Sequence, residues 1–264
     1  PEGIRAHPDD ITITTGSQQA LDIITQIFIN PGDVIVAEAP SYVGALGVFR
    51  AYQANVVHVP LDKDGLIPEA LEDTLTKLER EGREVKFLYT VPNFHNPAGV
   101  SMSPERRPQI VEICERHHVL ILEDNPCMLG FNDQTMTPLQ RLNPDGVIYL
   151  GSFSKTFAPG YRVGWALANH AVTQRLVLAN ENAVLSPTKM GQLSISEYLR
   201  TYDWMAQIKE YRSMYRERRD AMTAALDKYL PQASWNVPEG GFYNWVKVPD
   251  GIDAKAMLPR ATTN

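Results

Sequence analysis

Cysteine is scarce in this sequence: its 264 residues include only Cys114 and Cys127. Two cysteines outside any metal-binding spacing provide neither a disulfide framework nor a zinc motif, and they favour a reducing, cytoplasmic compartment. Positive charge is not in excess either. The formal net charge of −6 gives no electrostatic reason to expect a nucleic acid or an anionic membrane as a partner. We therefore predict neither of these partners, and no metal site.

Membrane-spanning hydrophobic runs, a signal peptide, internal repeats and low-complexity segments are also missing. What remains is an ordinary globular composition, with 44% hydrophobic and 21% charged residues. A chain of this length can bury a substantial core, in one large domain or in one domain and part of another. The composition therefore predicts a globular protein of the size of an enzyme.

Apolar, β-branched runs alternate with segments of helical spacing along most of the chain. Strands are expected at 11–14, 34–37, 55–61, 85–91, 119–122, 147–150 and 163–168, and helices at 20–29, 41–52, 68–81, 103–118, 171–185, from 186 onward and at 204–229. Such alternation predicts an α/β fold, with a mainly parallel sheet covered by helices on both faces. In sheets of this kind, ligands bind at the carboxyl ends of the strands.

This pattern divides the chain into three parts. Residues 1–10 are polar and rich in turn formers, and we expect them to be the remnant of an N-terminal segment. Residues 11–203 form the large domain. Residues 204–264 form a connecting helix and an incomplete small α+β domain, with strands expected at 234–237 and 242–248. Because the chain ends inside this small domain, we expect it to be a fragment of a longer protein.

The segment Gly151–Trp165 carries the most informative group of side chains. It follows an expected buried strand and places Lys155 among hydroxyl groups and glycines. A lysine amine at a strand end suits Schiff-base chemistry with a carbonyl group. Ser152, Ser154 and Arg162 are the hydroxyl and guanidinium donors that a phosphate group needs. Taken alone, these residues are explained equally well by a polar surface loop with a solvated lysine.

Two motifs follow the first two expected strands. Gly16, Ser17 and Gln18 open a helix, where free backbone amides and the helix dipole bind anions. Ser17 as a simple helix cap is the competing interpretation, and it is the better one for this motif alone. Tyr42 is either a ring that stacks on a flat ligand or an ordinary core residue.

Two further motifs follow later strands. The Asn96–Pro97 bond, followed closely by Gly99, predicts a tight turn and a candidate cis peptide, which on its own needs no chemistry. Asp124 stands at the carboxyl end of an expected central strand. An acid at that place is a helix cap or a functional carboxylate, and we favour the functional role because the nearby helix supplies its own capping residues.

In this order, the strand-end motifs resemble those of fold-type-I pyridoxal 5'-phosphate (PLP) enzymes, in particular class I/II aminotransferases. The most specific part is Ser-Phe-Ser-Lys at 152–155, followed by Pro-Gly-Tyr-Arg-Val-Gly at 159–164. The resemblance covers nearly the whole chain. It is closest to the branch that holds 2-aminoadipate and kynurenine aminotransferases and the aminotransferase-like domains of MocR regulators. The expected fold is thus the three-layer α/β/α large domain of fold type I with part of its small domain.

The resemblance implies a role for each of these residues. Lys155 would form the Schiff base (internal aldimine) with PLP and then shuttle the proton at the substrate α-carbon. Asp124 would pair with the pyridine nitrogen, Asn96 would bond the phenolate oxygen of the ring, and Tyr42 would stack on the ring. The phosphate group would be bound by Gly16, Ser17, Gln18, Ser152, Ser154 and Arg162.

Cys127 departs from the family pattern, which usually has at this position a tyrosine that also bonds the phenolate oxygen. Because a thiol is a weak donor, we expect a weaker contact with the cofactor here. The resemblance also implies that two elements lie outside this chain. One is an N-terminal segment with a cofactor-contacting tyrosine, and the other is an arginine that binds the substrate α-carboxylate.

The implied function is an aminotransferase of amino acid metabolism and biosynthesis, homodimeric when full length. It would move an amino group from an α-amino acid to a 2-oxo acid in a ping-pong cycle through pyridoxamine phosphate. Two alternatives fit the same residues. One is the effector domain of a MocR-type transcription regulator, which needs an upstream DNA-binding segment. The other is a PLP-dependent C–S lyase, because elimination needs the same lysine and aspartate.

Overall fold

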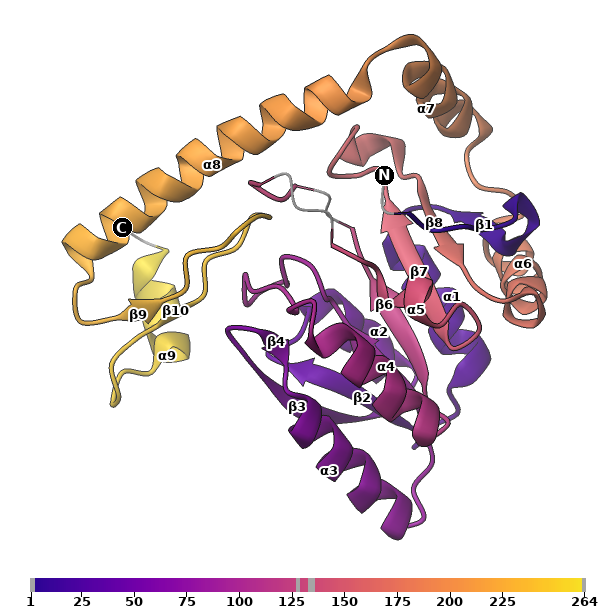
Figure 1. Ribbon diagram of the computed structural model, residues 1–264, viewed down its shortest axis with the longest axis horizontal. Coiled ribbons are helices and arrows are strands. Elements are labelled where there is room, and N and C mark those ends of the chain that lie inside the picture. Colours follow the sequence, from indigo (N-terminus) through magenta and orange to yellow (C-terminus); the bar gives the residue numbers. More distant parts are fainter. Residues whose placement is uncertain (1–2, 127–128, 133–135, 263–264) are drawn as a thin grey trace.

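The computed structural model describes residues 3–126, 129–132 and 136–262. Within these residues, a large sheet is covered by helices on both faces, and a long helix leads from it to a smaller C-terminal part (Figure 1). Cys127, for which we expect a cofactor contact, lies outside the described residues. None of the helices in the described ranges is both long and apolar enough to cross a membrane.

The central sheet has eight strands over the described residues, in the order β1-β8-β7-β6-β5-β2-β3-β4. The strands are β1 (Ile11–Thr14), β2 (Val34–Ala39), β3 (Asn55–Asp62), β4 (Gly65–Leu66), β5 (Val85–Thr90), β6 (Leu120–Asp124), β7 (Val147–Ser152) and β8 (Gly164–Leu167). The pairs β3–β2, β2–β5, β5–β6 and β6–β7 are parallel. The pairs β7–β8, β8–β1 and β3–β4 are antiparallel. The sheet is therefore mixed and mainly parallel, as predicted.

Seven of the helices in the described residues lie near the predicted positions, whereas the short helices α5 and α9 are not predicted from the sequence. The helices are α1 (Ser17–Phe28), α2 (Val43–Ala51), α3 (Pro68–Arg80), α4 (Arg106–Arg116), α5 (Leu139–Leu142), α6 (His170–Val184), α7 (Lys189–Thr201), α8 (Trp204–Tyr229) and α9 (Ala254–Ala261), with short 3-10 turns η1 (Pro8–Asp10) and η2 (Pro159–Tyr161). Two helix starts differ from expectation. The helix expected to begin at residue 41 begins at Val43, with Tyr42 at its cap position. Ser17 is the first residue of α1, with Gly16 at the cap position, so its side chain is free to face a ligand.

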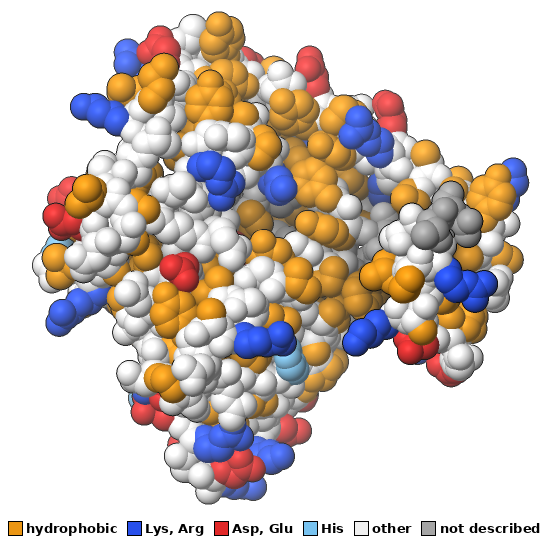
Figure 2. Space-filling model, turned by 180° about the vertical axis from the view of Figure 1, so that it is seen from behind, with side chains coloured by type: hydrophobic (Ala, Val, Ile, Leu, Met, Phe, Trp, Pro, Cys, Tyr) orange, Lys and Arg blue, Asp and Glu red, His pale blue; other side chains and the backbone are white. Residues whose placement is uncertain are grey.

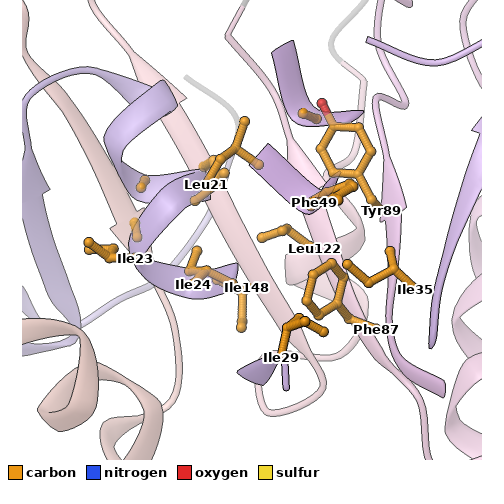
Figure 3. Close-up of a cluster of buried hydrophobic side chains, with 14 of the residues drawn as sticks. Leu21, Ile23, Ile24, Ile29, Ile35, Phe49, Phe87, Tyr89, Leu122 and Ile148 are labelled. Carbon is orange, nitrogen blue, oxygen red and sulfur yellow. The ribbon is translucent and has the colours of Figure 1, made fainter. Parts of the chain in front are cut away.

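One face of the sheet packs against α1, α2 and α6. Leu21 and Ile24 from α1 and Phe49 from α2 meet Phe87 and Leu122 of the sheet in one hydrophobic cluster (Figure 3). Each of these side chains is 0–1% exposed. Removing that much apolar surface from water is the main favourable term in folding, and here it fixes α1 and α2 against the strands.

The opposite face packs against α3, α4 and α5 through a second cluster, which includes Leu71, Ile110 and Leu139. Strand β2 shows how one run of residues serves both faces. Ile35 belongs to the first cluster and Val36 to the second, because successive side chains of a strand point to opposite faces. The continuous apolar run in the sequence is thus the mark of a strand buried on both sides, and the three-layer fold is confirmed.

The C-terminal part differs most from expectation. The predicted strands at 234–237 and 242–248 are reduced to β9 (Ser234–Trp235) and β10 (Val246–Lys247). The segment between them pairs instead with the loop after β6: Phe131 N donates to Glu239 O at 2.7 Å, and Gly241 N donates to Leu129 O at 3.0 Å. These bonds draw residues 239–243 toward the carboxyl ends of the parallel strands.

Candidate active site

A cavity of about 190 Å³ that opens to solvent lies at the carboxyl ends of the parallel strands. Seen from behind, the molecule is hollowed between the sheet and the C-terminal part, and hydrophobic side chains gather around the hollow (Figure 2). Nine residues that the sequence predicts for the site line this cavity: Ser17, Gln18, Tyr42, Asn96, Asp124, Ser152, Ser154, Lys155 and Arg162. Gly16 lies directly against the guanidinium of Arg162. The fold therefore brings together, in one cavity, motifs that are far apart in sequence.

The N-terminus of α1 forms one end of the cavity. Gly16, at the cap position, has a φ of +79°, a conformation that costs glycine little and other residues more. A Cβ at this position would overlap the guanidinium of Arg162. Gly164 of β8 is equally constrained, because its Cβ would lie 2.6 Å from the backbone nitrogen of Ser17. These glycines let a cation and a strand approach the helix terminus, where free amides attract anions.

Arg162 and the two serines complete this end of the cavity. Arg162 has left-handed backbone angles, φ 51° and ψ 49°, and its Nη1 donates to Ser154 Oγ at 3.3 Å. Its Nη2 donates to Thr15 O at 3.4 Å. Ser152 Oγ accepts from Ser154 N at 3.0 Å, which fixes the loop after β7. A guanidinium, two hydroxyl groups and a helix N-terminus thus meet at one place, and this group of donors suits a phosphate.

Tyr42 stands before α2 with its ring in the cavity lining. Its hydroxyl donates to Gln18 Oε1 at 3.2 Å, and Gln18 Nε2 donates to Gly44 O at 3.2 Å. Burial, followed by the charge of Asp124, raises the pKa of the Tyr42 phenol above its ordinary value. The ring is therefore neutral near pH 7 and held at its outer end, as a stacking surface requires.

Asp124 ends β6 and is 3% exposed. Tyr89 on the neighbouring strand donates its hydroxyl to Asp124 Oδ2 at 2.9 Å. Among the described residues, the buried Oδ1 has no hydrogen-bond partner. Burial raises the pKa of the carboxyl group to about 6, against the opposing effects of the Tyr89 bond and of His95. A buried carboxylate with a vacant acceptor needs a donor, ideally a charged one.

The loop after β5 carries Asn96 into the cavity, and the Asn96–Pro97 peptide is cis, as the sequence suggested. Two buried charged groups hold this loop. Arg107 Nη2 donates to Asn93 Oδ1 at 2.6 Å. Glu38 accepts from Val91 N at 2.8 Å and lies 3.0 Å from His95 Nε2. Asn96 is therefore placed by a supported turn and not by a free loop.

Lys155 projects from the loop after β7, and its Nζ lies over the ring of Phe242 at 5.6 Å from the centroid. Within the described part of the chain, Lys155 forms no ion pair with an acidic side chain. Phe242 is held in turn by Tyr215 of α8, with ring centroids 4.7 Å apart in an edge-to-face arrangement. An amine that faces a cavity without an acidic partner is available for reaction with a carbonyl.

Sequence reasoning missed six residues that line the cavity: Val91, Asn93, Phe94, Pro126, Phe242 and Tyr243. Phe242 and Tyr243 fall within the strand that the sequence predicts at 242–248. Their place depends on the turn at Gly240 and Gly241, because Cβ atoms there would overlap or crowd Phe94. The Gly-Gly pair before two aromatic residues is the signal that could have found them, since it indicates close backbone approach.

This fold and this arrangement define a fold-type-I PLP-dependent transferase scaffold. Residues 2–258 match the family described as aminotransferase class I and II. The chain belongs to this family, whose cofactor is pyridoxal 5'-phosphate.

Similar proteins were found in sequence and in structure. Aromatic-amino-acid aminotransferase 1 of Thermococcus litoralis is 42% identical over 255 residues, covering 96% of this chain and 61% of that protein. Kynurenine aminotransferase of Pyrococcus horikoshii, crystallised with PMP, KYN and KYA, matches with a TM-score of 0.94 and 41% identity, covering 98% of this chain and 65% of that one. The uncharacterized HTH-type transcriptional regulator YdfD of Bacillus subtilis is 32% identical over 262 residues, covering 98% of this chain and 53% of that protein. The chain spans less than two thirds of each of these proteins.

The cavity residues fit this cofactor on three observations. The unpartnered, buried Oδ1 of Asp124 is the acceptor that a protonated pyridine nitrogen requires. The space that a Cβ would fill at Gly16 is taken by the guanidinium of Arg162, so a cation stands at the helix N-terminus, a place that suits the cofactor's phosphate group. Lys155 supplies the amine that this cofactor's aldehyde needs.

Proposed function

We propose that the complete protein is a PLP-dependent aminotransferase that moves an amino group between an α-amino acid and a 2-oxo acid. The observation that supports this most is the composition of one cavity: an amine, a buried carboxylate with a vacant oxygen, and a guanidinium beside hydroxyl groups. When bound, PLP supplies an electron sink that stabilises negative charge at the substrate α-carbon. The cavity residues supply binding, orientation and proton transfer.

Lys155 has two proposed tasks. Its Nζ holds the cofactor covalently between turnovers, and it then takes the proton from the substrate α-carbon and returns it. The second task needs an amine that is free to change its protonation state. Nζ faces the ring of Phe242, and no acidic partner holds it among the described residues.

Asp124 is the proposed partner of the pyridine nitrogen. Its Oδ1 accepts the N–H hydrogen bond, and its negative charge keeps that nitrogen protonated. Asn96 is the proposed donor to the phenolate oxygen and Tyr42 the proposed stacking ring. At the far end, Arg162, beside Ser154 and Gly16, and the residues at the start of α1 would bind the phosphate group.

We further propose that the protein works as a homodimer. Hydrophobic side chains on α7 and near its start are strongly exposed: Leu185 is 86%, Met190 76% and Leu193 58% accessible. Val43, at the start of α2, is 78% exposed. Clusters of exposed apolar side chains are typical of interfaces. Light scattering on the complete protein tests this: a dimer mass is expected, and Leu185→Glu is expected to lower it.

We also propose that the chain comprises two domains. The sheet and the helices up to α7 form the cofactor-binding domain, and α8 leads to a smaller domain that contributes Phe242 and Tyr243 to the cavity. We propose a cytoplasmic location, because the sequence has only two cysteines and Cys114 is free and buried.

A transamination assay with purified complete protein and PLP tests the proposed activity. Aromatic amino acids and kynurenine belong in the panel of amino donors, because similar proteins carry those names. Consumption of the donor with equimolar formation of a new amino acid from the oxo acid is expected. Release of ammonia in place of a new amino acid would show a lyase and contradict the proposal.

A regulator is the second candidate, and the similarity to YdfD favours it. On this alternative, the same cavity binds PLP, but the complete protein carries a DNA-binding segment before residue 1. Sequencing the complete gene decides between the two. An upstream winged-helix segment, together with absent transaminase activity, would support the regulator and contradict the enzyme.

A further inference from the structure

Tyr89 is a buried residue whose place in the sheet brings its hydroxyl to Asp124. In the parallel pair β5–β6, Tyr89 stands opposite Leu122, two residues before Asp124. Residues two apart on a strand share a face, so Tyr89, Leu122 and Asp124 project to the same side. The long phenol side chain leans along the strand direction and donates to Asp124 Oδ2 at 2.9 Å.

The ring of Tyr89 is held so that this hydroxyl stays in place. Phe49 of α2 packs against it edge to face, with centroids 5.4 Å apart, and both side chains are 0% exposed. In Figure 3 the hydroxyl stands at the edge of the cluster and points away from the labelled hydrophobic side chains. Burial raises the pKa of the Tyr89 phenol well above its ordinary value, so this group stays protonated and can donate a hydrogen bond throughout the neutral range.

The two oxygens of Asp124 are thereby distinguished. Oδ2 is occupied by Tyr89, whereas the buried Oδ1 has no partner among the described residues. Asp124 also lines the cavity. We propose that Tyr89 is a positioning residue for Asp124: its hydroxyl holds one carboxylate oxygen and presents the other to the cofactor nitrogen. The proposal rests on the proposed binding of PLP in this cavity.

A neutral donor suits this position. A lysine or arginine beside Asp124 would cancel the negative charge that must act on the cofactor nitrogen, whereas a phenol stabilises that charge and leaves it in place. The other titratable groups that act on Asp124 are His95, from the loop after β5, and Tyr42, before α2. Tyr89 is the one that donates directly to the carboxylate.

The competing interpretation is that Tyr89 is a core residue whose hydroxyl needs some partner. Both interpretations expect a modest loss of stability in Tyr89→Phe, because a buried carboxylate loses a donor. Only the positioning role expects a change in the proton affinity of Asp124 and in the protonation of the bound cofactor. These two quantities therefore form the test.

The first measurement follows the Asp124 carboxyl by carbon NMR in the cofactor-free complete protein labelled with ¹³C-aspartate. Asp124→Asn assigns the signal. In Tyr89→Phe the titration midpoint is expected to rise by about one pH unit, because the carboxylate loses a donor. Substituting 3-fluorotyrosine at position 89 keeps the ring and strengthens the donor, so the midpoint is expected to fall.

Tyr149→Phe is the matched control. Tyr149 is 2% exposed on β7 and stands opposite Glu123, on the other face of the sheet from Asp124. Its removal also deletes a buried hydroxyl, yet the Asp124 midpoint is expected to stay where it is. A midpoint that does not move in Tyr89→Phe, or that moves equally in the control, would overturn the proposal.

The second measurement uses PLP labelled with ¹⁵N at the ring nitrogen, bound to each protein. The nitrogen shift reports its protonation directly and needs no turnover. A lower protonated fraction is expected in Tyr89→Phe than in the wild type and the control, while an equal fraction in all three would contradict the proposal. If the wild type fails to bind PLP, the proposed function fails, and the cofactor-free titration still decides whether Tyr89 acts on Asp124.

Discussion

The guanidinium of Arg162 occupies the space that a Cβ would fill at Gly16. These residues are far apart in sequence and meet because β8 passes the N-terminus of α1 between β1 and β7. Because Gly16 has no side chain, the guanidinium of Arg162 can lie at the start of α1, where the helix amides attract an anion.

Gly16→Ala should therefore weaken the binding of the cofactor as well as the fold. The φ of +79° with a ψ of 164° makes alanine unfavourable by about 1–3 kcal/mol, and the new methyl group displaces Arg162 from the proposed phosphate position. We expect the dissociation constant for PLP to rise about tenfold, since one charge-assisted contact is lost. Fluorescence titration of the cofactor-free protein measures this.

Gly32→Ala is the control for that substitution. Gly32 has a φ of +89°, but a Cβ there would meet nothing within 4 Å. It should show a similar loss of stability with unchanged PLP affinity. Equal losses of affinity in the two variants would mean that strain, and not the position of Arg162, explains the first result.

Asp124→Asn should lower turnover far more than cofactor retention. Without the carboxylate, the pyridine nitrogen loses the charge that keeps it protonated, and the electron sink is lost with it. The contacts at the phosphate end remain, so PLP should still bind. We expect kcat to fall by at least two orders of magnitude, measured by steady-state transamination beside a dialysis assay for bound PLP. Near-normal kcat in this variant would identify another acid as the partner of the nitrogen.

The same carboxyl group makes the cofactor-free fold sensitive to pH. Its pKa is raised from an ordinary 3.8 to about 6, so the folded state binds the proton more tightly than the unfolded state. The stability from this group is fully present below about pH 4 and is lost as the pH rises through 6. A shift of about two units corresponds to about 3 kcal/mol.

Urea unfolding of the cofactor-free protein between pH 4 and 7 measures this effect. As the pH rises, the unfolding free energy of the wild type should fall relative to that of Asp124→Asn. Parallel curves for the two proteins would show that the carboxyl group titrates at its ordinary pKa in the folded state.

Glu38→Gln should loosen the loop that carries Asn96. Glu38 accepts from Thr90 Oγ1 at 2.8 Å and from Val91 N at 2.8 Å, and it lies 3.0 Å from His95 Nε2. Glutamine offers one acceptor where two are needed, so a buried donor loses its partner. We expect a loss of about 1–3 kcal/mol in unfolding free energy.

Glu72→Gln serves as the comparison, because Glu72 pairs with Arg116 at a partly exposed site and should contribute less than about 1 kcal/mol. Denaturant unfolding measures both variants. A smaller loss in Glu38→Gln than in Glu72→Gln would show that the buried contacts do not support the loop.

Much of this architecture was predictable because its causes are local. The apolar run of β2 indicates a strand with two buried faces, and parallel strands end at one edge, which brings Asp124 and Lys155 together. The positions of Phe242 and Tyr89 were not predictable. The first depends on backbone bonds between Gly241 and Leu129, and the second on the register of β5 against β6. Such relations between distant segments leave no periodicity in the sequence.

The central claim is that Lys155 is the residue that holds PLP in this cavity. Borohydride reduction of the PLP-loaded complete protein, followed by peptide mapping, tests it most directly. We expect a pyridoxyl group on the peptide that contains Lys155, and no such group in Lys155→Ala, which should still bind PLP through the phosphate contacts. A pyridoxyl group on another lysine of the wild type, with Lys155 unmodified, would contradict it.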